Sequence, residues 1–290
     1  MQNETKRMSK VPKYFRWIAW GITLLAYAYL AYRLLTYDSW GELASNLRDA
    51  DAAAWLCGLA ALLLMPLNML LEAWRWQFLV GNLPLREAHR QVYFSKMAGQ
   101  LTPYQLGEYP ARGLLMADRK WSEILSLGVV GSMTMTLAII LVGMVPLILW
   151  VGEDRWTPQW GTIGLLVLAA VALTVALPWL LRRWVTVDSR MLFGSLGQSV
   201  LRYLCWCVQL ALVMRLFGLP CSAGWLIQIP VYYLLITIAP STSVVELGVR
   251  GATAIFVFGS AEATLAAALL WAINSLLPML IGTFVRKNAK

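Results

Sequence analysis

Charged residues are scarce in this sequence. Only 13% of the 290 residues are Asp, Glu, Lys or Arg, whereas 59% are hydrophobic. A typical soluble domain carries about 25% charged residues. The composition therefore predicts an integral membrane protein. Lys and Arg outnumber Asp and Glu by 24 to 15. In a membrane protein this excess indicates topology and contact with anionic lipid, so nucleic acid is not an expected partner.

Residues that bind metals or perform catalysis are also rare. His89 is the only histidine, and the four cysteines are Cys57, Cys205, Cys207 and Cys221. Their spacing resembles no metal-ligand set, so we expect neither a zinc site nor a disulfide. The H-E-x-x-H, G-x-S-x-G and Walker A motifs are missing from the sequence, and these are the patterns of common hydrolases and ATPases. We therefore expect no cofactor, no metal, no enzymatic activity and no ATP-driven pumping.

Long apolar runs are plentiful. A membrane-spanning helix needs about 20 apolar residues, and six segments qualify: 14–35, 54–80, 122–150, 161–181, 196–217 and 262–285. The first follows a basic N-terminus, but it is longer than the apolar region of a typical signal peptide, so we interpret it as an uncleaved span. We expect a single transmembrane domain over residues 14–285, with a basic N-terminus (1–13) and a short tail (286–290) in the cytoplasm.

Two further apolar segments are interrupted by helix-breaking residues. Residues 86–118 are interrupted by Pro103, Gly107 and Pro110, and residues 224–260 by Pro230, Pro240 and Gly248. Irregular backbone at membrane depth is tolerated only where it is buried in protein or lines a wet cavity. We therefore predict two broken re-entrant hairpins. The predicted fold class is an all-α polytopic membrane protein with six full spans and these two hairpins.

Basic residues are distributed unevenly in this topology. Most of them fall in segments that the topology places in the cytoplasm, whereas the outer loops contain only Arg48 and Arg155. Cytoplasmic loops of membrane proteins are enriched in Lys and Arg. We therefore predict a multi-pass protein of the cell membrane with both termini in the cytoplasm.

A short polar motif occurs twice, once in each broken segment. Both copies read E-x-x-x-R-G, starting at Glu108 and at Glu246, and a proline precedes the two glutamates by five and six residues. Each half of the chain then reads span, span, broken segment, span. Three full spans separate equivalent points, so the two halves (about 14–150 and 161–285) are predicted to be inverted relative to each other. Inverted repeats with discontinuous helices are a recurrent transporter architecture.

The duplicated motif points to binding of a polar head group. Ionisable residues at bilayer depth are costly and default to a functional hypothesis. A half-helix that begins at a break directs free N–H groups and a positive dipole end inward, which attracts phosphate. Arginine binds phosphate in a bidentate manner, and the glutamates can pair with the arginines or receive an ammonium group. The candidate substrate-binding residues are Glu108, Arg112, Glu246, Arg250, Pro103, Gly107, Pro240, Ser241, Lys96 and Arg75.

Purely structural interpretations compete with this hypothesis. The two Glu–Arg pairs have the i,i+4 spacing of simple helical salt bridges. Lys96 has the length to reach the inner interface by snorkelling, and Arg75 is expected to pair with Glu72 near the inner end of its span. Arg202 and Arg215 are expected near the two ends of the fifth span, where they too can snorkel, and Gln209 is expected to make a packing hydrogen bond.

These motifs resemble the flippase-like transmembrane region of the lysylphosphatidylglycerol synthase family. The resemblance rests on Arg75-Trp76, on Pro103 to Arg112, and on the proline-glycine element from Pro240 to Gly251. It covers about residues 14–285. The chain departs from the family pattern in two places. Gly251 stands where the family has a glutamate, and residues 241–245 replace a glycine-rich run.

The resemblance implies a lipid translocase. Such a protein would move aminoacyl-phosphatidylglycerol or a polyprenyl-phosphate-linked lipid between leaflets, so the implied partners are membrane lipids and a separate lipid-modifying enzyme or glycosyltransferase. Two alternatives stay open. One is an accessory membrane subunit of a lipid or glycan synthesis system that does not transport, and the other is an intramembrane enzyme acting on a lipid phosphate. The sequence does not specify the cargo, the energy source or the oligomeric state.

Overall fold

The computed structural model describes most of the chain after residue 47. The described residues are 41, 45, 48–99, 107–116, 119–151, 188–238 and 246–285, with isolated positions at 161, 164, 168, 172 and 176. They form helices and contain no β-strand. The helices are α3 (Ala52–Val80), α4 (Leu85–Gly99), α5 (Glu108–Gly113), α6 (Trp121–Val151), α8 (Ser189–Leu216), α9 (Trp225–Ile238), α10 (Glu246–Phe258), α11 (Ala261–Trp271), the π-helix η2 (Ala272–Leu276) and α12 (Leu277–Val285).

Four stretches of the described chain are long and apolar enough to cross a membrane. They are α3, α6, α8 and the continuous stretch Glu262–Phe284, which joins α11, η2 and α12. These four correspond to the predicted spans 54–80, 122–150, 196–217 and 262–285, so the protein is an all-helical membrane protein. Predicted span 14–35 lies outside the described residues, and only isolated positions of 161–181 are described.

The two long helices α3 and α8 have matching ends. Each begins at an aspartate whose side chain accepts a backbone N–H three residues later, Asp51 from Ala54 at 2.7 Å and Asp188 from Met191 at 2.6 Å. A glycine with positive φ follows the end of each helix, with φ of 84° at Gly81 directly after α3 and 82° at Gly218 two residues after α8. An aspartate cap satisfies free N–H groups, and glycine adopts positive φ without strain. Local sequence therefore fixes where both helices start and stop.

Each interrupted segment contains two helices. Residues 86–118 include α4 and α5, and residues 224–260 include α9 and α10. Residues 100–106 and 239–245, which join them, lie outside the described part of the chain. Pro103, Pro240 and Ser241 fall in these joins, so the structure does not place these three candidate residues. Gly107 is described and immediately precedes α5.

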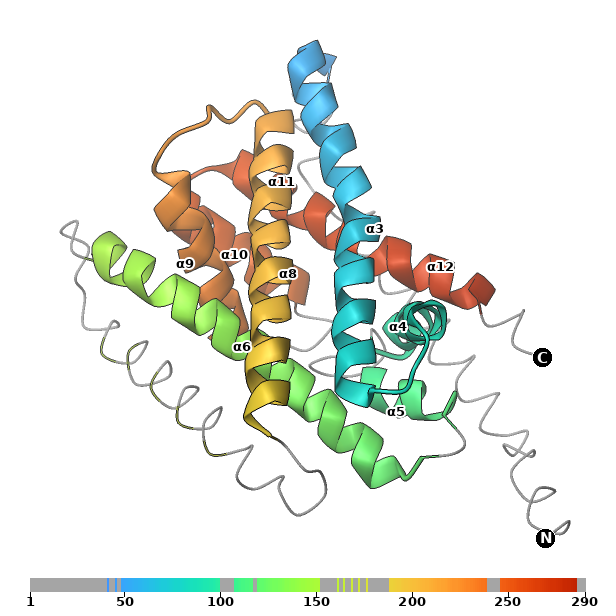
Figure 1. Ribbon diagram of the computed structural model, residues 1–290. Coiled ribbons are helices and arrows are strands. Elements are labelled where there is room, and N and C mark those ends of the chain that lie inside the picture. Colours follow the sequence, from blue (N-terminus) through green and yellow to red (C-terminus); the bar gives the residue numbers. More distant parts are fainter. Residues whose placement is uncertain are drawn as a thin grey trace, which may run out of the picture. The chain divides into compact units, whose positions relative to one another are not determined.

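Segments that are distant in sequence pack together (Figure 1). Helix α8 runs beside α3, α9 packs on α6, and α12 packs on α4. Each broken segment therefore contacts the last long helix of the other half of the chain. The α4–α12 contact is especially close, because a Cβ built at Gly282 of α12 would overlap the backbone carbonyl of Tyr93 in α4. Small residues allow such close approach between membrane helices.

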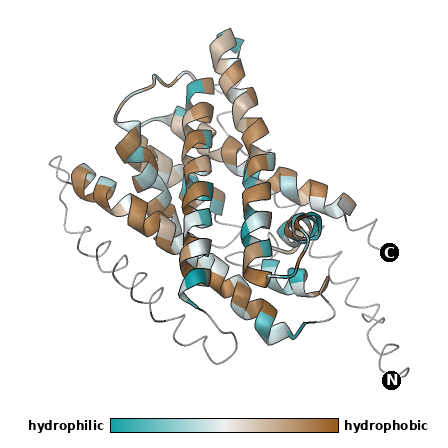
Figure 2. Cartoon of the chain, viewed as in Figure 1, coloured by the Kyte–Doolittle hydropathy of each residue, from teal (hydrophilic) through white to brown (hydrophobic). Residues whose placement is uncertain are grey.

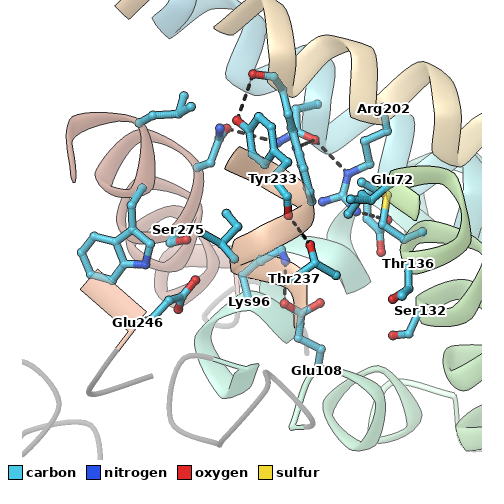
Figure 3. Close-up of a pocket in the computed structure, with 18 of the residues that line it drawn as sticks. Glu72, Lys96, Glu108, Ser132, Thr136, Arg202, Tyr233, Thr237, Glu246 and Ser275 are labelled. Carbon is cyan, nitrogen blue, oxygen red and sulfur yellow. Dashed lines mark hydrogen bonds and ion pairs between the residues drawn. The ribbon is translucent and has the colours of Figure 1, made fainter. Parts of the chain in front are cut away.

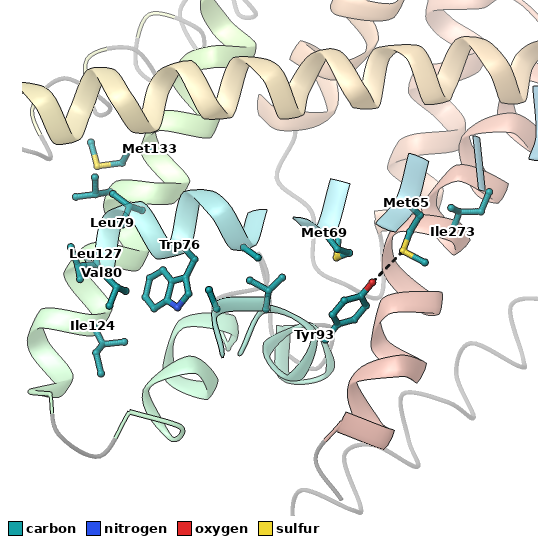
Figure 4. Packing of buried hydrophobic residues seen from close by; sticks show 14 residues of the cluster. Met65, Met69, Trp76, Leu79, Val80, Tyr93, Ile124, Leu127, Met133 and Ile273 are labelled. Atoms are coloured by element: carbon teal, nitrogen blue, oxygen red, sulfur yellow. Dashed lines mark hydrogen bonds between the residues drawn. The ribbon is translucent and has the colours of Figure 1, made fainter. Parts of the chain in front are cut away.

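An apolar core lies where α3, α4 and α6 meet (Figure 4). Trp76 fills the space between α3 and the other two helices, and its indole N–H donates to Gln91 of α4 at 2.7 Å. The cluster is formed mainly by large apolar side chains, namely Met65, Met69, Trp76, Leu79, Val80, Tyr93, Ile124, Leu127, Met133 and Ile273. This core holds α4 against α3 and so fixes the position of the polar side chains on both helices.

The outer faces of the long helices are apolar, whereas several charged residues are buried (Figure 2). Helix α3 exposes a row of leucines, among them Leu56, Leu59, Leu63 and Leu67. Helix α6 exposes Leu141, Val145, Ile148 and Leu149. A soluble protein would hide such rows, so these faces are suited to lipid. The buried polar groups therefore lie on the protein-facing sides of the same helices.

Candidate functional site

Glu72 of α3 is the centre of a buried ionic network. Its Oε2 accepts hydrogen bonds from Arg75 Nη2 at 2.5 Å and from Arg202 Nη1 at 2.7 Å. Its Oε1 accepts one from Arg112 Nη2 at 2.7 Å. The residue is only 3% exposed. One carboxylate thus joins three arginines from α3, α5 and α8, and this linkage compensates charges that would otherwise be very costly at this depth.

A second carboxylate extends the network toward α4. Glu108, at the start of α5, accepts a hydrogen bond from Lys96 Nζ at 2.5 Å through Oε1. Its Oε2 lies 3.3 Å from Nη2 of Arg112, four residues later. Both partners are buried, and Arg112 is 2% exposed. Arg112 therefore bridges the two carboxylates, while Lys96 contacts Glu108 as its one carboxylate among the described residues.

Neutral groups hold the arginines in place. Arg75 Nη1 donates to the Gly131 carbonyl at 2.8 Å and to Ser199 Oγ at 2.9 Å, and Arg112 Nε donates to Ser95 Oγ at 3.1 Å. The guanidinium of Arg112 lies 4.8 Å from the Trp76 ring centroid. Arg202 stacks on another indole, at 4.9 Å from the Trp206 ring. Stacking and hydrogen bonding of this kind fix a planar guanidinium in one orientation.

A chain of amide side chains connects the network to the π-helix. Asn68 accepts from Arg202 Nε at 2.8 Å and from Trp206 Nε1 at 2.9 Å, and it donates to Asn274 at 3.1 Å. Asn274 in turn donates to Gln209 at 2.9 Å. Asn274 lies in η2, and single π-turns are frequent at functional sites. The π-turn thereby contributes an amide to the orientation of Arg202.

The second copy of the duplicated motif forms its own pair. Arg250 donates through Nε at 3.1 Å and Nη2 at 2.8 Å to Oε1 of Glu246, both in α10. The two side chains are more exposed than those of the first copy, at 24% and 13% of their side-chain surface. The charges of Glu246 and Arg250 cancel each other. Both side chains are more accessible than Glu108 and Arg112.

The network and the second pair border one cavity of about 310 Å³. Figure 3 shows Arg202 and Glu72 on one side of it, Lys96 and Glu108 below, and Glu246 across from Arg202. Hydroxyl groups from α6, α9 and η2 complete the polar lining, namely Ser132, Thr136, Tyr233, Thr237 and Ser275. Its size falls near the lower end of the roughly 300–1,000 Å³ typical of small-molecule sites.

The charges around the cavity do not balance. The network contains four cations (Arg75, Lys96, Arg112 and Arg202) and two carboxylates, Glu72 and Glu108. Glu246 and Arg250 cancel each other. The described part of the site therefore carries a formal excess of two positive charges. Residues 100–106 and 239–245, which complete the two broken segments, contain no Asp, Glu, Lys, Arg or His in the sequence.

Six of the ten predicted site residues are placed at this cavity or in its network. Five of them line the cavity, namely Arg75, Lys96, Glu108, Glu246 and Arg250. Arg112 does not line it but contacts the lining residues Glu72 and Glu108. The i,i+4 contacts expected for both Glu–Arg pairs are confirmed. Gly107 is described next to Glu108, while Pro103, Pro240 and Ser241 lie outside the described residues.

One expectation about an individual charge was wrong, and another was confirmed but incomplete. Arg202 was expected to snorkel from an end of its helix, but it lies in the middle of α8 and is buried against Glu72. Glu72 pairs with Arg75 as expected, and it also binds Arg112 and Arg202. Arg215 does lie at the end of α8, where it pairs with Asp51 at 3.2 Å. Gln209 makes the expected packing hydrogen bond, donating to the Ala61 carbonyl at 2.9 Å.

Sequence reasoning missed Asn68 and Asn274 altogether. A buried asparagine in an apolar helix was the available signal, because polar residues facing lipid are disfavoured and those facing the bundle hydrogen-bond across helices. No protein-family model and no curated protein matches this chain. The resemblance to the flippase-like region therefore rests on the sequence motifs, and the lipid-transport role that it implies is a proposal.

Proposed function

We propose that this protein is a lipid translocase that carries the head group of a phosphate-bearing lipid through the cavity while the acyl or prenyl tail stays in the bilayer. The candidate cargoes are a phospholipid, such as aminoacyl-phosphatidylglycerol, or a polyprenyl-phosphate-linked lipid. The observation that carries the proposal is the excess of positive charge around a polar cavity that lies between the candidate membrane-spanning helices and the two broken segments. A buried excess of this kind is unfavourable unless an anion enters, and phosphate is the anion common to membrane lipid head groups.

The arrangement of the two halves supports transport rather than static binding. Helices α3, α4, α5 and α6 have counterparts of the same order in α8, α9, α10 and the α11–η2–α12 stretch. The broken segment of each half packs on the last spanning stretch of the other half, α4 on α12 and α9 on α6. We infer that the two halves form an inverted repeat with two re-entrant broken segments. In transporters of this architecture, one half rocks against the other around a central site.

Removal of a network arginine should impair transport. We expect Arg112→Gln and Arg202→Gln to reduce the rate of lipid exchange between leaflets at least tenfold, because each change removes one of the two excess positive charges that attract the head group. The glutamine removes the charge but keeps a polar side chain that can still donate and accept hydrogen bonds. The measurement is the leaflet distribution over time of fluorescent phosphatidylglycerol and of a polyprenyl phosphate lipid in reconstituted vesicles.

A matched control is available on the same helix. Arg215→Gln removes an arginine from the end of α8, away from the cavity, and should leave the exchange rate unchanged. Purified variants must elute as single species before reconstitution, so that loss of folding is not mistaken for loss of transport. Wild-type rates in folded Arg112→Gln and Arg202→Gln proteins would contradict the proposal. Binding of lipid without exchange by wild type would favour an accessory subunit, and conversion of the lipid to a new product would favour an intramembrane enzyme.

The role of Glu108 distinguishes two kinds of cargo. If Glu108 only positions Arg112 and Lys96, then Glu108→Gln should reduce the exchange rate less than Arg112→Gln does. If it receives an ammonium group of the cargo, the two variants should be equally impaired with an aminoacylated lipid but not with phosphatidylglycerol. Parallel exchange measurements with both lipids separate these cases.

A further inference from the structure

Two cations at the cavity have more hydrogen-bond donors than the described residues provide acceptors for. Lys96 Nζ can donate three hydrogen bonds and has one acceptor, Glu108, among the described residues. Arg202 uses Nε for Asn68 and Nη1 for Glu72, while its Nη2 has no acceptor in the described part of the chain. Both residues line the cavity. By contrast, Arg75 is held by Glu72, Gly131 and Ser199. The free donors therefore point to the Lys96 and Arg202 side chains as the ligand contacts.

From these donors and the charge excess we propose that the cavity selects a lipid whose head group is a phosphate monoester, in preference to the phosphodiester of common phospholipids. This inference rests on the proposed lipid-transport function and specifies its cargo. A phosphate monoester carries a charge of about −1.5 to −2 at pH 7 and has three strong acceptor oxygens. A phosphodiester carries one negative charge and presents only two charged oxygens.

The charge count distinguishes these two head groups. The network holds two more cations than carboxylates, and Glu246 with Arg250 adds none. A dianionic head group neutralises the site fully, whereas a phosphodiester leaves one buried cation without a counter-charge. An uncompensated buried charge is strongly unfavourable. A zwitterionic head group would leave the entire excess in place.

The geometry favours the same head group. Tight binding of an unsubstituted phosphate requires donors from more than one direction, and Lys96 lies on α4 while Arg202 lies on α8. Hydroxyl groups of Ser132, Thr136 and Thr237 line the same space. Arginine and lysine together provide a planar fork and a compact point charge, which suit adjacent oxygens of one phosphate. No described acid on the cavity wall lacks a cationic partner, so none repels the second negative charge unopposed.

The test compares two lipids that differ by one methyl group. Phosphatidic acid carries a phosphate monoester, and phosphatidylmethanol with the same acyl chains carries the corresponding diester. The full-length protein in detergent is titrated with each lipid, and the concentration that gives half-maximal thermal stabilisation is recorded at pH 7.5. We expect phosphatidic acid to act at a concentration about tenfold lower, because one further ionic interaction at a partly buried site is worth a factor of this order.

Variants connect the preference to the proposed donors. Lys96→Gln removes one excess charge and should lower the preference for phosphatidic acid severalfold, whereas Lys96→Arg keeps the charge and should retain it. Arg215→Gln lies outside the site and should behave as wild type. If the Lys96→Gln protein does not fold, the phosphatidic acid and phosphatidylmethanol titrations of the wild-type and Lys96→Arg proteins still test the preference, which both must show. Glycerol 3-phosphate, a soluble phosphate monoester, is added as a competitor, and the proposal requires that it competes far more weakly than phosphatidic acid.

The outcomes separate this inference from the general function. Equal titration midpoints for the two lipids would overturn selection of a monoester but leave lipid translocation intact. Stabilisation by glycerol 3-phosphate at the same concentration as phosphatidic acid would show a site for soluble phosphate esters and would overturn the lipid cargo. Failure of every anionic lipid to stabilise the protein would remove the proposed function together with this inference.

Discussion

Glu72→Ala should destabilise the protein more than any other polar substitution in the network. It would leave Arg75, Arg112 and Arg202 buried beside one another without the carboxylate that all three contact. Removing one partner of a buried ion pair typically costs about 3–5 kcal/mol, and here three pairs are lost at once. We expect the purified variant to unfold at a much lower temperature than wild type, or to be recovered only as aggregate.

A double variant tests whether charge rather than packing is responsible. Glu72→Gln combined with Arg202→Gln removes one charge of each sign and should recover part of the stability lost in Glu72→Gln alone. The matched control is Glu87→Ala on α4, which breaks a half-exposed pair with Arg90. Exposed pairs contribute about 0–1 kcal/mol, so its melting temperature should be near that of wild type. A similar melting temperature for Glu72→Ala and Glu87→Ala would refute the central role of Glu72.

Gly282→Ala should disrupt the contact between α12 and α4. The added methyl group would overlap the carbonyl of Tyr93, and a backbone carbonyl cannot turn away as a side chain can. The helices must separate, which costs about 1–3 kcal/mol for overpacking of this kind. Thermal or denaturant unfolding of the purified protein in detergent measures the loss.

An equivalent substitution elsewhere should have the opposite sign. Gly197 lies within α8, and a Cβ built there meets no atom within 4 Å. Alanine is better than glycine in a helix interior by about 0.5–1 kcal/mol, so Gly197→Ala should leave stability unchanged or raise it. If Gly282→Ala were as stable as Gly197→Ala, the close approach of α12 and α4 would not exist in the folded protein.

Hydropathy and local motifs predicted much of the described fold. Apolar runs of sufficient length located α3, α6, α8 and the Glu262–Phe284 stretch, because crossing a bilayer imposes a minimum length on a helix. The prolines and glycines of the two interrupted segments indicated that each contains two shorter helices. The i,i+4 spacing predicted the pairs Glu108–Arg112 and Glu246–Arg250, because four residues bring side chains to one face of a helix.

The hub of the site could not be predicted in the same way. Glu72 contacts Arg112 and Arg202 over sequence separations of 40 and 130 residues, and no local spacing encodes such contacts. The error on Arg202 has a specific origin. The apolar run starts at residue 196, which placed Arg202 near a helix end, but α8 begins seven residues earlier at Ser189 with Asp188 as its cap. Polar residues extend that helix beyond its apolar run.

The Glu72 hub also constrains the order in which the protein can be assembled in the membrane. Glu72 and Arg75 belong to one helix, so α3 enters the bilayer as a neutral pair. Arg202 is synthesised much later, and an arginine at the centre of an inserting helix costs about 2.5–3.5 kcal/mol. That cost is relieved when α8 docks on α3 and the Arg202 guanidinium reaches Glu72. We therefore expect α3 to assist the insertion of α8, because the Glu72 carboxylate is already in the membrane when Arg202 arrives.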